Sequence, residues 1–112
     1  MTKNIQNVEE AKETIKTNDI VLFMKGTKDI PGCGFSANVV QILNNLNVKY
    51  IDIDVLSDDN LKESMKKFTN WPTFPQLYVK GEFVGGCDIV KEMFESGELL
   101  ELFNTKGIDV KT

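Results

Sequence analysis

The sequence predicts an α/β fold in which a central mixed four-stranded sheet is flanked by about five helices. Two short strand-like segments, one apolar at residues 20–24 and one alternating at residues 50–54, are separated by a stretch with helical periodicity, which is typical of parallel strands joined by a crossover. Two further segments flank the pair Lys80-Gly81, a tight-turn signal that predicts an antiparallel hairpin. Helical spacing of apolar residues recurs before, between and after these strands.

The first two predicted elements are a helix that begins near residue 8 and a strand at residues 20–24. Asn7 and Glu10 are spaced as in a capping box. Apolar residues then follow at helical spacing: Val8, Ala11 and Ile15. The run from Ile20 to Met24 is short and apolar, as buried strands are. Residues 25–32 contain two glycines and a proline and are expected to form a loop.

A second helix, a second strand and a third helix are expected next. Residues 36–47 carry apolar side chains on one helical face: Val39, Val40, Leu43 and Leu46. Residues 50–54 alternate as a strand does. Ser57 is expected to cap the third helix, with Asp58 and Asp59 placed well against the dipole of its first turn. Its predicted inner face is formed by Leu61, Met65 and Phe68.

The last third of the chain predicts a hairpin and two helices. The hairpin strands are residues 76–79 and 82–84, and Asp88 is expected to cap a fourth helix. Apolar positions in that helix are Val90, Met93 and Phe94, and those of a fifth helix after Gly97 are Leu99, Leu100 and Phe103. This order is the layout of thioredoxin-like proteins. The length of 112 residues fits one domain, which we expect to span residues 1–112.

Composition excludes several classes of function. A net charge of −4 argues against binding to nucleic acid or to anionic membranes. No apolar run approaches the roughly 20 residues that span a bilayer. The absence of histidine removes Cys/His proteolytic chemistry and imidazole acid–base catalysis. The chain has two cysteines and no visible targeting peptide, which predicts an intracellular reducing compartment. These features do not distinguish the cytoplasm from the mitochondrion.

Cys33 is the main candidate for chemistry because it lies where the second helix begins. Unpaired backbone N–H groups and the positive end of the helix dipole favour a thiolate there, and Lys25 adds a second positive charge. The alternative is a small residue that merely fills a turn. Ser36, three residues on, cannot attack a mixed disulfide at neutral pH. A group bound to Cys33 must therefore be released by an outside thiol or by Cys87.

Four blocks of sequence resemble the monothiol glutaredoxins over roughly residues 8–103. The active-site motif of that family resembles Cys33-Gly34-Phe35-Ser36. The other three blocks are Phe23-Met24-Lys25-Gly26-Thr27, Trp71-Pro72-Thr73-Phe74-Pro75-Gln76 and Gly85-Gly86-Cys87-Asp88-Ile89. Two positions depart from the family pattern. Gly32 replaces a larger residue and is expected to loosen the loop. Lys62 replaces an arginine, so a single ammonium group takes the place of a guanidinium that can bind a carboxylate through two N–H groups.

The resemblance implies a glutathione site built from ten residues: Lys25, Cys33, Phe35, Lys62, Thr73, Phe74, Pro75, Gly86, Cys87 and Asp88. It implies a cis bond before Pro75, with the backbone of Phe74 offered to the cysteinyl part of glutathione. Cys87 and Asp88 would meet the γ-glutamyl end, and Lys25 or Lys62 the glycine carboxylate. Trp71 and Pro72 are expected to serve packing and the turn. Cys87 is either inert or able to form a disulfide with Cys33.

The resemblance also implies two competing functions. In the first, Cys33 binds a bridging 2Fe-2S cluster for iron–sulfur cluster assembly and transfer to apoproteins. Such clusters usually take four thiolates, so two chains and two glutathiones would complete the set, giving a homodimer with the cluster and a monomer without it. In the second, Cys33 reduces protein–glutathione mixed disulfides, with weak turnover at most. A glutathione-binding adaptor without either activity is a third class.

Overall fold

The structure is a computed structural model that describes residues 2–3 and 7–110. The helices of that part of the chain are α1 (Val8–Thr17), α2 (Gly34–Asn45), α3 (Asp59–Thr69), α4 (Cys87–Ser96) and α5 (Glu98–Thr105), with a short 3₁₀ helix η1 (Val55–Ser57). The strands are β1 (Thr2–Lys3), β2 (Ile20–Met24), β3 (Ile51–Asp54), β4 (Gln76–Val79) and β5 (Glu82–Gly85). None of these helices is long and apolar enough to cross a membrane.

The predicted mixed sheet is confirmed, with one strand added at its edge. β2 pairs with β3 in parallel and with β4 in the antiparallel sense, and β5 returns antiparallel beside β4. The two-residue strand β1 pairs in parallel with β3, which gives the order β1-β3-β2-β4-β5. The sequence did not predict β1, because two residues are too few to show a period.

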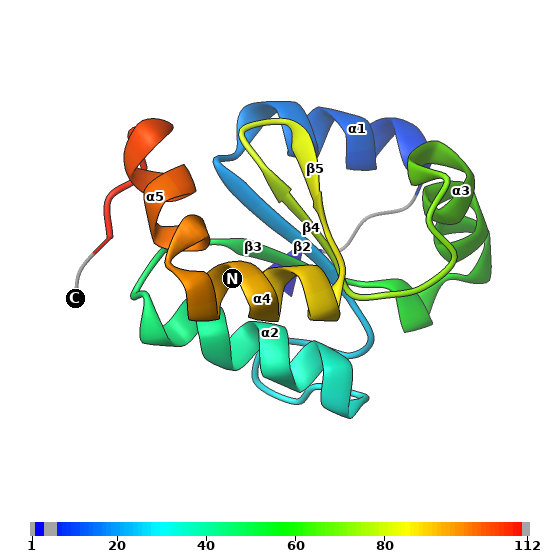
Figure 1. Cartoon of the computed structure of the whole chain (residues 1–112). Coiled ribbons are helices and arrows are strands. Elements are labelled where there is room, and N and C mark those ends of the chain that lie inside the picture. The colour runs from blue at the N-terminus through cyan, green and yellow to red at the C-terminus, as the bar shows by residue number, and fades with distance from the viewer. Residues whose placement is uncertain (1, 4–6, 111–112) are drawn as a thin grey trace.

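Helices cover both faces of the sheet. α2 and α4 lie together on one side and α1 lies on the other (Figure 1). Ile20, Leu22 and Met24 of β2 belong to the core cluster under α2 and α4, whereas Val21 and Phe23 belong to the cluster under α1 and α3. Because β2 is buried on both faces, its sequence is continuously apolar rather than alternating.

Two predicted helix caps are wrong. Ser57 ends η1, and α3 is capped by Asp58, whose Oδ1 accepts hydrogen bonds from the backbone N–H groups of Asn60 and Leu61 at 2.8 and 3.2 Å. α4 is preceded by Gly86 as its N-cap residue, so Asp88 lies inside the first turn and makes no capping bond. In both cases the chain begins its helix one or two residues away from the best sequence signal.

Phe68, which was predicted for the inner face of α3, and Leu100, an apolar position of α5, are both partly exposed. Phe68 is 47% exposed and stacks on Tyr78, with ring centroids 6.4 Å apart. Leu100 is 37% exposed, while its neighbour Leu99 is fully buried. Each lies next to the apolar stripe of its helix, where periodicity alone does not separate the rim of the core from its interior.

Candidate functional site

Cys33 is the N-cap residue of α2, as its position in the sequence predicted. Its backbone is extended, with φ −157° and ψ 161°, and its Sγ accepts a hydrogen bond from the N–H of Ser36 at 3.5 Å. The N–H of Phe35 is also directed to this sulfur. A helix start thus presents two backbone donors to the thiol, which is the arrangement that favours its ionised form.

Ser36 connects Cys33 to the end of β2. Its side chain is fully buried, and its Oγ accepts a hydrogen bond from the N–H of Lys25 at 3.1 Å. The Cys33 thiol donates to the same oxygen at 3.5 Å. If the thiol loses its proton, the Ser36 hydroxyl can turn its own hydrogen to the sulfur while it still accepts from Lys25. Ser36 therefore supports the thiolate rather than resolving a disulfide.

The pKa of Cys33 lies below its ordinary value. Burial raises it, but hydrogen bonds from the side chain and backbone of Ser36 and from the backbone of Phe35 lower it by more. The charge of Lys25 acts in the same direction as these bonds. The predicted acidic thiol is therefore present, and its main cause is hydrogen bonding to the charged form.

The pKa of Cys87 is raised above its ordinary value, chiefly by burial. A hydrogen bond from the Asn38 side chain opposes this, and the negative charges of Asp88 and Cys33 add to it. Both cysteines are free thiols. Cys33 is consequently the better nucleophile of the two, and the role of Asn38 was not evident from the sequence.

A cavity of about 400 Å³ lies between the N-termini of α2 and α4. Its lining residues come from four separate segments of the chain: Lys25, Phe35, Trp71, Thr73, Phe74, Pro75, Gly86, Cys87, Asp88 and Ile89. They include every residue predicted for the glutathione site except Cys33 and Lys62. The fold thus gathers at one place the blocks on which the sequence comparison rested.

The segment before β4 forms one wall of this cavity. The peptide bond between Phe74 and Pro75 is cis, as the resemblance implied. The buried amide of Gln76 donates hydrogen bonds to the carbonyl oxygens of Trp71 and Thr73, both at 3.2 Å. These bonds hold the wall in shape. Gln76 is therefore a structural member of the site that the sequence offered only as a strand residue.

Trp71 packs against its neighbours, as expected, and it also lines the cavity. Its ring meets that of Phe83 edge-on at 5.9 Å. Its Nε1 is buried and lies 3.2 Å from the point where a side chain at Gly86 would begin. A Cβ at Gly86 would also stand 3.2 Å from the carbonyl oxygen of Pro75. A glycine at position 86 therefore leaves room for the Trp71 ring and the Pro75 carbonyl group to approach the backbone closely.

Charges at the two ends of the cavity come from Asp88 and Lys25. Asp88 is exposed in the first turn of α4, next to the backbone N–H groups that begin that helix. Lys25 follows β2 and is half-buried. Lys62 lies on α3 and is not among the residues that line the cavity. Of the two lysines predicted for the glycine carboxylate of glutathione, Lys25 is the one placed at this cavity.

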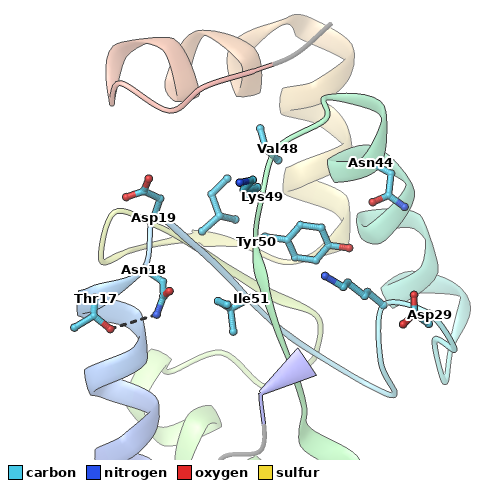
Figure 2. A pocket seen from close by; sticks show the side chains of 11 residues that line it. Thr17, Asn18, Asp19, Asp29, Asn44, Val48, Lys49, Tyr50 and Ile51 are labelled. Atoms are coloured by element: carbon cyan, nitrogen blue, oxygen red, sulfur yellow. Dashed lines mark hydrogen bonds between the residues drawn. The ribbon is translucent and has the colours of Figure 1, made fainter. Parts of the chain in front are cut away.

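A larger hollow of about 720 Å³ lies at the other end of β2, where that strand begins at Ile20. Figure 2 shows the ring of Tyr50 reaching across it, with the hydroxyl directed toward the side where Asn44 and Asp29 lie. Neither cysteine lines this hollow. The larger hollow is therefore separate from the residues predicted for the site, most of which line the smaller cavity.

Comparisons with known proteins agree with this geometry. The family model for glutaredoxin matches residues 20–84, from the start of β2 to the end of the hairpin. The chain is also 60% identical over 97 residues to a monothiol glutaredoxin 2 from Rickettsia typhi. That alignment covers 87% of this chain and 85% of the relative. The family-model match includes Lys25, Phe35 and the segment before β4, and it ends just before the start of α4.

Two solved structures are similar over nearly the whole chain. One is the solution structure of a monomeric truncated mutant of 1-C-Grx1 from Trypanosoma brucei, with a TM-score of 0.88, 38% identity, and 96% and 98% of the two chains covered. The other is reduced apo GrxS14 from poplar, with a TM-score of 0.78, 47% identity, and 88% and 90% covered. With one acidic thiol at the start of α2 and Ser36 three residues on, the chain belongs to the glutaredoxin family and is a monothiol glutaredoxin.

Proposed function

We propose that this protein binds glutathione in the cavity beside Cys33 and uses Cys33 to hold a bridging 2Fe-2S cluster for iron–sulfur cluster assembly. The observation that carries the proposal is a cavity lined by a cation and a helix N-terminus, with the acidic thiol of Cys33 two residues before Phe35 in its lining. Cys33 supplies the thiolate, Lys25 the cation, and α4 the N-terminus with Asp88 in its first turn. Together these groups are complementary to a tripeptide that has a carboxylate at each end and an ammonium at one.

In the proposed complex, glutathione lies across the cavity from α4 to Lys25. The γ-glutamyl carboxylate accepts hydrogen bonds from the backbone N–H groups at the start of α4, and the γ-glutamyl ammonium forms an ion pair with the carboxylate of Asp88. The cysteinyl part pairs with the backbone of Phe74, which precedes the cis bond to Pro75. The glycine carboxylate pairs with Lys25. Phe35 and Thr73 close the sides of the cavity.

The donor set fits a cluster that is shared between two chains. In the described part of the chain, no group of three or more cysteine, aspartate or glutamate side chains is placed to hold a metal ion. Cys33 alone offers an acidic, half-exposed sulfur, so each chain contributes one thiolate. The thiol of bound glutathione contributes a second. Two chains and two glutathiones then provide the four thiolates that such a cluster takes, and the bound cluster supplies the iron and sulfide passed to apoproteins.

The surroundings of Ser36 favour the carrier over the reductase. The Ser36 hydroxyl is fully buried and bonded on one side to Lys25 and on the other to Cys33. A group attached to Cys33 therefore meets no resolving thiol at this position. The reductase is the second candidate, because the acidic thiol of Cys33 is also suited to attack a glutathione mixed disulfide. In that reaction free glutathione would release the enzyme.

Anaerobic reconstitution separates the two functions. The protein is incubated with iron, sulfide and glutathione, desalted, and examined by visible absorption; a parallel sample is assayed on a glutathionylated protein. The proposal predicts a stable brown species, transfer of its iron to an apoprotein, and slow mixed-disulfide turnover. A colourless product together with brisk turnover would reject the carrier in favour of the reductase.

A further inference from the structure

The loop from Lys25 to Cys33 is fastened to one face of β3. The N–H of Gly26 donates to Asp54 Oδ1 at 3.0 Å, and the N–H of Lys28 donates to Asp52 Oδ2 at 2.8 Å. The ammonium of Lys28 also lies over the ring of Tyr50, 5.2 Å from its centroid. Side chains at alternate positions of a strand share a face. Tyr50, Asp52 and Asp54 therefore form one row, which we call the loop-facing row.

Asp54 binds the start of the loop directly and the backbone of Leu56, which lies near the end of the loop. Besides Gly26, its Oδ1 accepts a hydrogen bond from the N–H of Leu56 at 2.8 Å. That bond keeps the Leu56 side chain beside Gly32, where a Cβ would lie 3.2 Å from Leu56 Cδ1. The space left free by the glycine at position 32 is thus used by a leucine that Asp54 positions. Gly32 precedes Cys33 directly, so this carboxylate acts on the start of the loop directly and near its end through Leu56.

A series of hydrogen bonds connects the loop to the sulfur of Cys33. The N–H of Gly32 donates to the carbonyl oxygen of Lys25 at 2.7 Å, so the loop is closed across its base. The N–H of Lys25 then donates to Ser36 Oγ, which contacts Cys33 Sγ. The expectation that Gly32 loosens the loop stays a prediction. Asp52, at the far side, is wholly buried, and a carboxylate is kept in such a place only when it is bonded.

We propose that Asp52 and Asp54 are positioning residues of the thiol site, which fasten the loop to β3 and so hold Lys25 at the cavity and the Cys33 sulfur beside Ser36. The inference rests on the proposed binding of glutathione at that cavity. The sequence indicates these two acidic residues only as polar positions of an alternating strand. Their bonds to the loop assign them a part in the site that neither touches directly.

The test compares four variants for glutathione affinity and for Cys33 reactivity. Asp54→Ala removes the acceptor, and Asp54→Asn keeps an acceptor oxygen without the charge. Asp58→Ala is the matched control, because Asp58 also accepts two backbone N–H bonds but caps α3 instead of the loop. Leu56→Ala removes the side chain that lies beside Gly32, where a Cβ would stand 3.2 Å from Leu56 Cδ1, and this side chain is already 51% exposed. Affinity is read from the fluorescence of Trp71, the single tryptophan, which lines the cavity.

We expect Asp54→Ala to weaken glutathione binding roughly tenfold, which corresponds to about one hydrogen bond to a charged group. Asp54→Asn should restore affinity to within about twofold of the wild type, and Asp58→Ala should leave it unchanged, since its lost bonds are outside the loop. Leu56→Ala should weaken binding by a smaller factor. The rate of Cys33 alkylation at pH 7, followed by mass spectrometry, should fall in parallel in Asp54→Ala and Leu56→Ala.

Wild-type affinity and alkylation rate in a folded Asp54→Ala protein would overturn the proposal, as would an equal loss in Asp58→Ala. If Asp54→Ala does not fold, wild-type behaviour of Leu56→Ala overturns it instead. Failure of the wild type to bind glutathione would reject the proposed function alone. The alkylation rates of Cys33 would still decide whether the loop-facing row positions the thiol, because they need no ligand.

Discussion

At the scale of single residues, the reactivity of Cys33 arises from neighbours within a few ångströms. Without histidine in the chain, no imidazole is present to take its proton. The proton is instead made easier to lose by the donors of Ser36 and Phe35 and by the charge of Lys25. The position of Cys33 and the sign of its pKa shift could be predicted, because a helix start is a local feature. The participation of the Ser36 side chain depends on burial and could not.

The two cysteines should titrate in opposite directions from an ordinary thiol. Because the pKa of Cys33 is lowered, a larger fraction of it is thiolate at each pH than for an ordinary thiol. As the pH is raised, its alkylation rate should therefore begin to increase at a lower pH than that of an ordinary thiol. The raised pKa of Cys87 should delay its alkylation to higher pH. Alkylation against pH, with the two sites separated by peptide mass, measures both. Coincident profiles would refute the hydrogen-bond account of Cys33.

Asp88→Ala should weaken glutathione binding far more than it weakens folding. Because Asp88 is not the cap of α4, its loss removes only a favourable charge in the first turn, worth about 0.3–1 kcal/mol. Loss of its bond to the ligand ammonium should cost about 1.5–3 kcal/mol. Calorimetric titration and urea unfolding measure the two effects. Glu95→Ala, at an exposed position of the same helix, is the control that should change neither greatly.

Trp71 and Gly86 show where residue-scale prediction stops. The sequence places Trp71 beside Pro72, which indicates a turn and nothing of the cavity. Its ring reaches the cavity because the segment before β4 folds over Gly86, fifteen positions away in the chain. Only a contact between distant segments reveals this. The exclusion of Lys62 from the cavity lining has the same origin, since the direction of α3 is set by packing.

At the scale of elements, the spacing of apolar residues and the local composition predicted the presence of most strands and helices. They did not predict the residues at which these elements begin and end. β2 and α2 were predicted because their apolar residues recur without interruption over several positions. The start of α3 was misplaced by one residue, since Ser57 and Asp58 are both good caps and η1 takes up the first. β1 depends wholly on its partner β3, so nothing local marks it.

Two glycines of the site should respond oppositely to the same substitution. Gly85 has φ +152° and a Cβ there would stand 2.9 Å from Ile89 Cβ, so Gly85→Ala should destabilise the fold by about 1–3 kcal/mol and disturb the start of α4. Gly34, in the first turn of α2, has open space around it. Gly34→Ala should be neutral or stabilise by up to about 1 kcal/mol. Urea unfolding tests the pair, and equal losses would contradict the structure.

At the scale of the whole molecule, the fold brings together segments that are far apart in the chain. The end of β2, the start of α2, the segment before β4 and the start of α4 meet at one end of the sheet. The resemblance to the monothiol glutaredoxins implied this meeting, because it assigned residues from all four segments to one glutathione site. It did not predict the fastening of the loop to β3, since an acidic residue in an alternating strand is normally taken to face water.

The account requires that a cluster join two molecules that are otherwise separate. In the proposed function each chain contributes Cys33 and one bound glutathione, so the second pair of iron ligands would come with a second chain. Cys33→Ser should abolish the cluster, because a hydroxyl stays protonated and is a poor ligand for iron. Cys87→Ser should keep most of it, because Cys87 is assigned to the wall of the cavity rather than to iron.

The most direct measurement is the mass and glutathione content of the reconstituted species. Wild type, Cys33→Ser and Cys87→Ser are reconstituted anaerobically with and without glutathione, then passed through size exclusion with light scattering and visible absorption. We predict that wild type and Cys87→Ser elute as coloured dimers with one glutathione per chain, and only when glutathione is supplied. The cluster-free protein should elute as a monomer. A coloured monomer, a coloured dimer free of glutathione, or a cluster retained by Cys33→Ser would contradict the account.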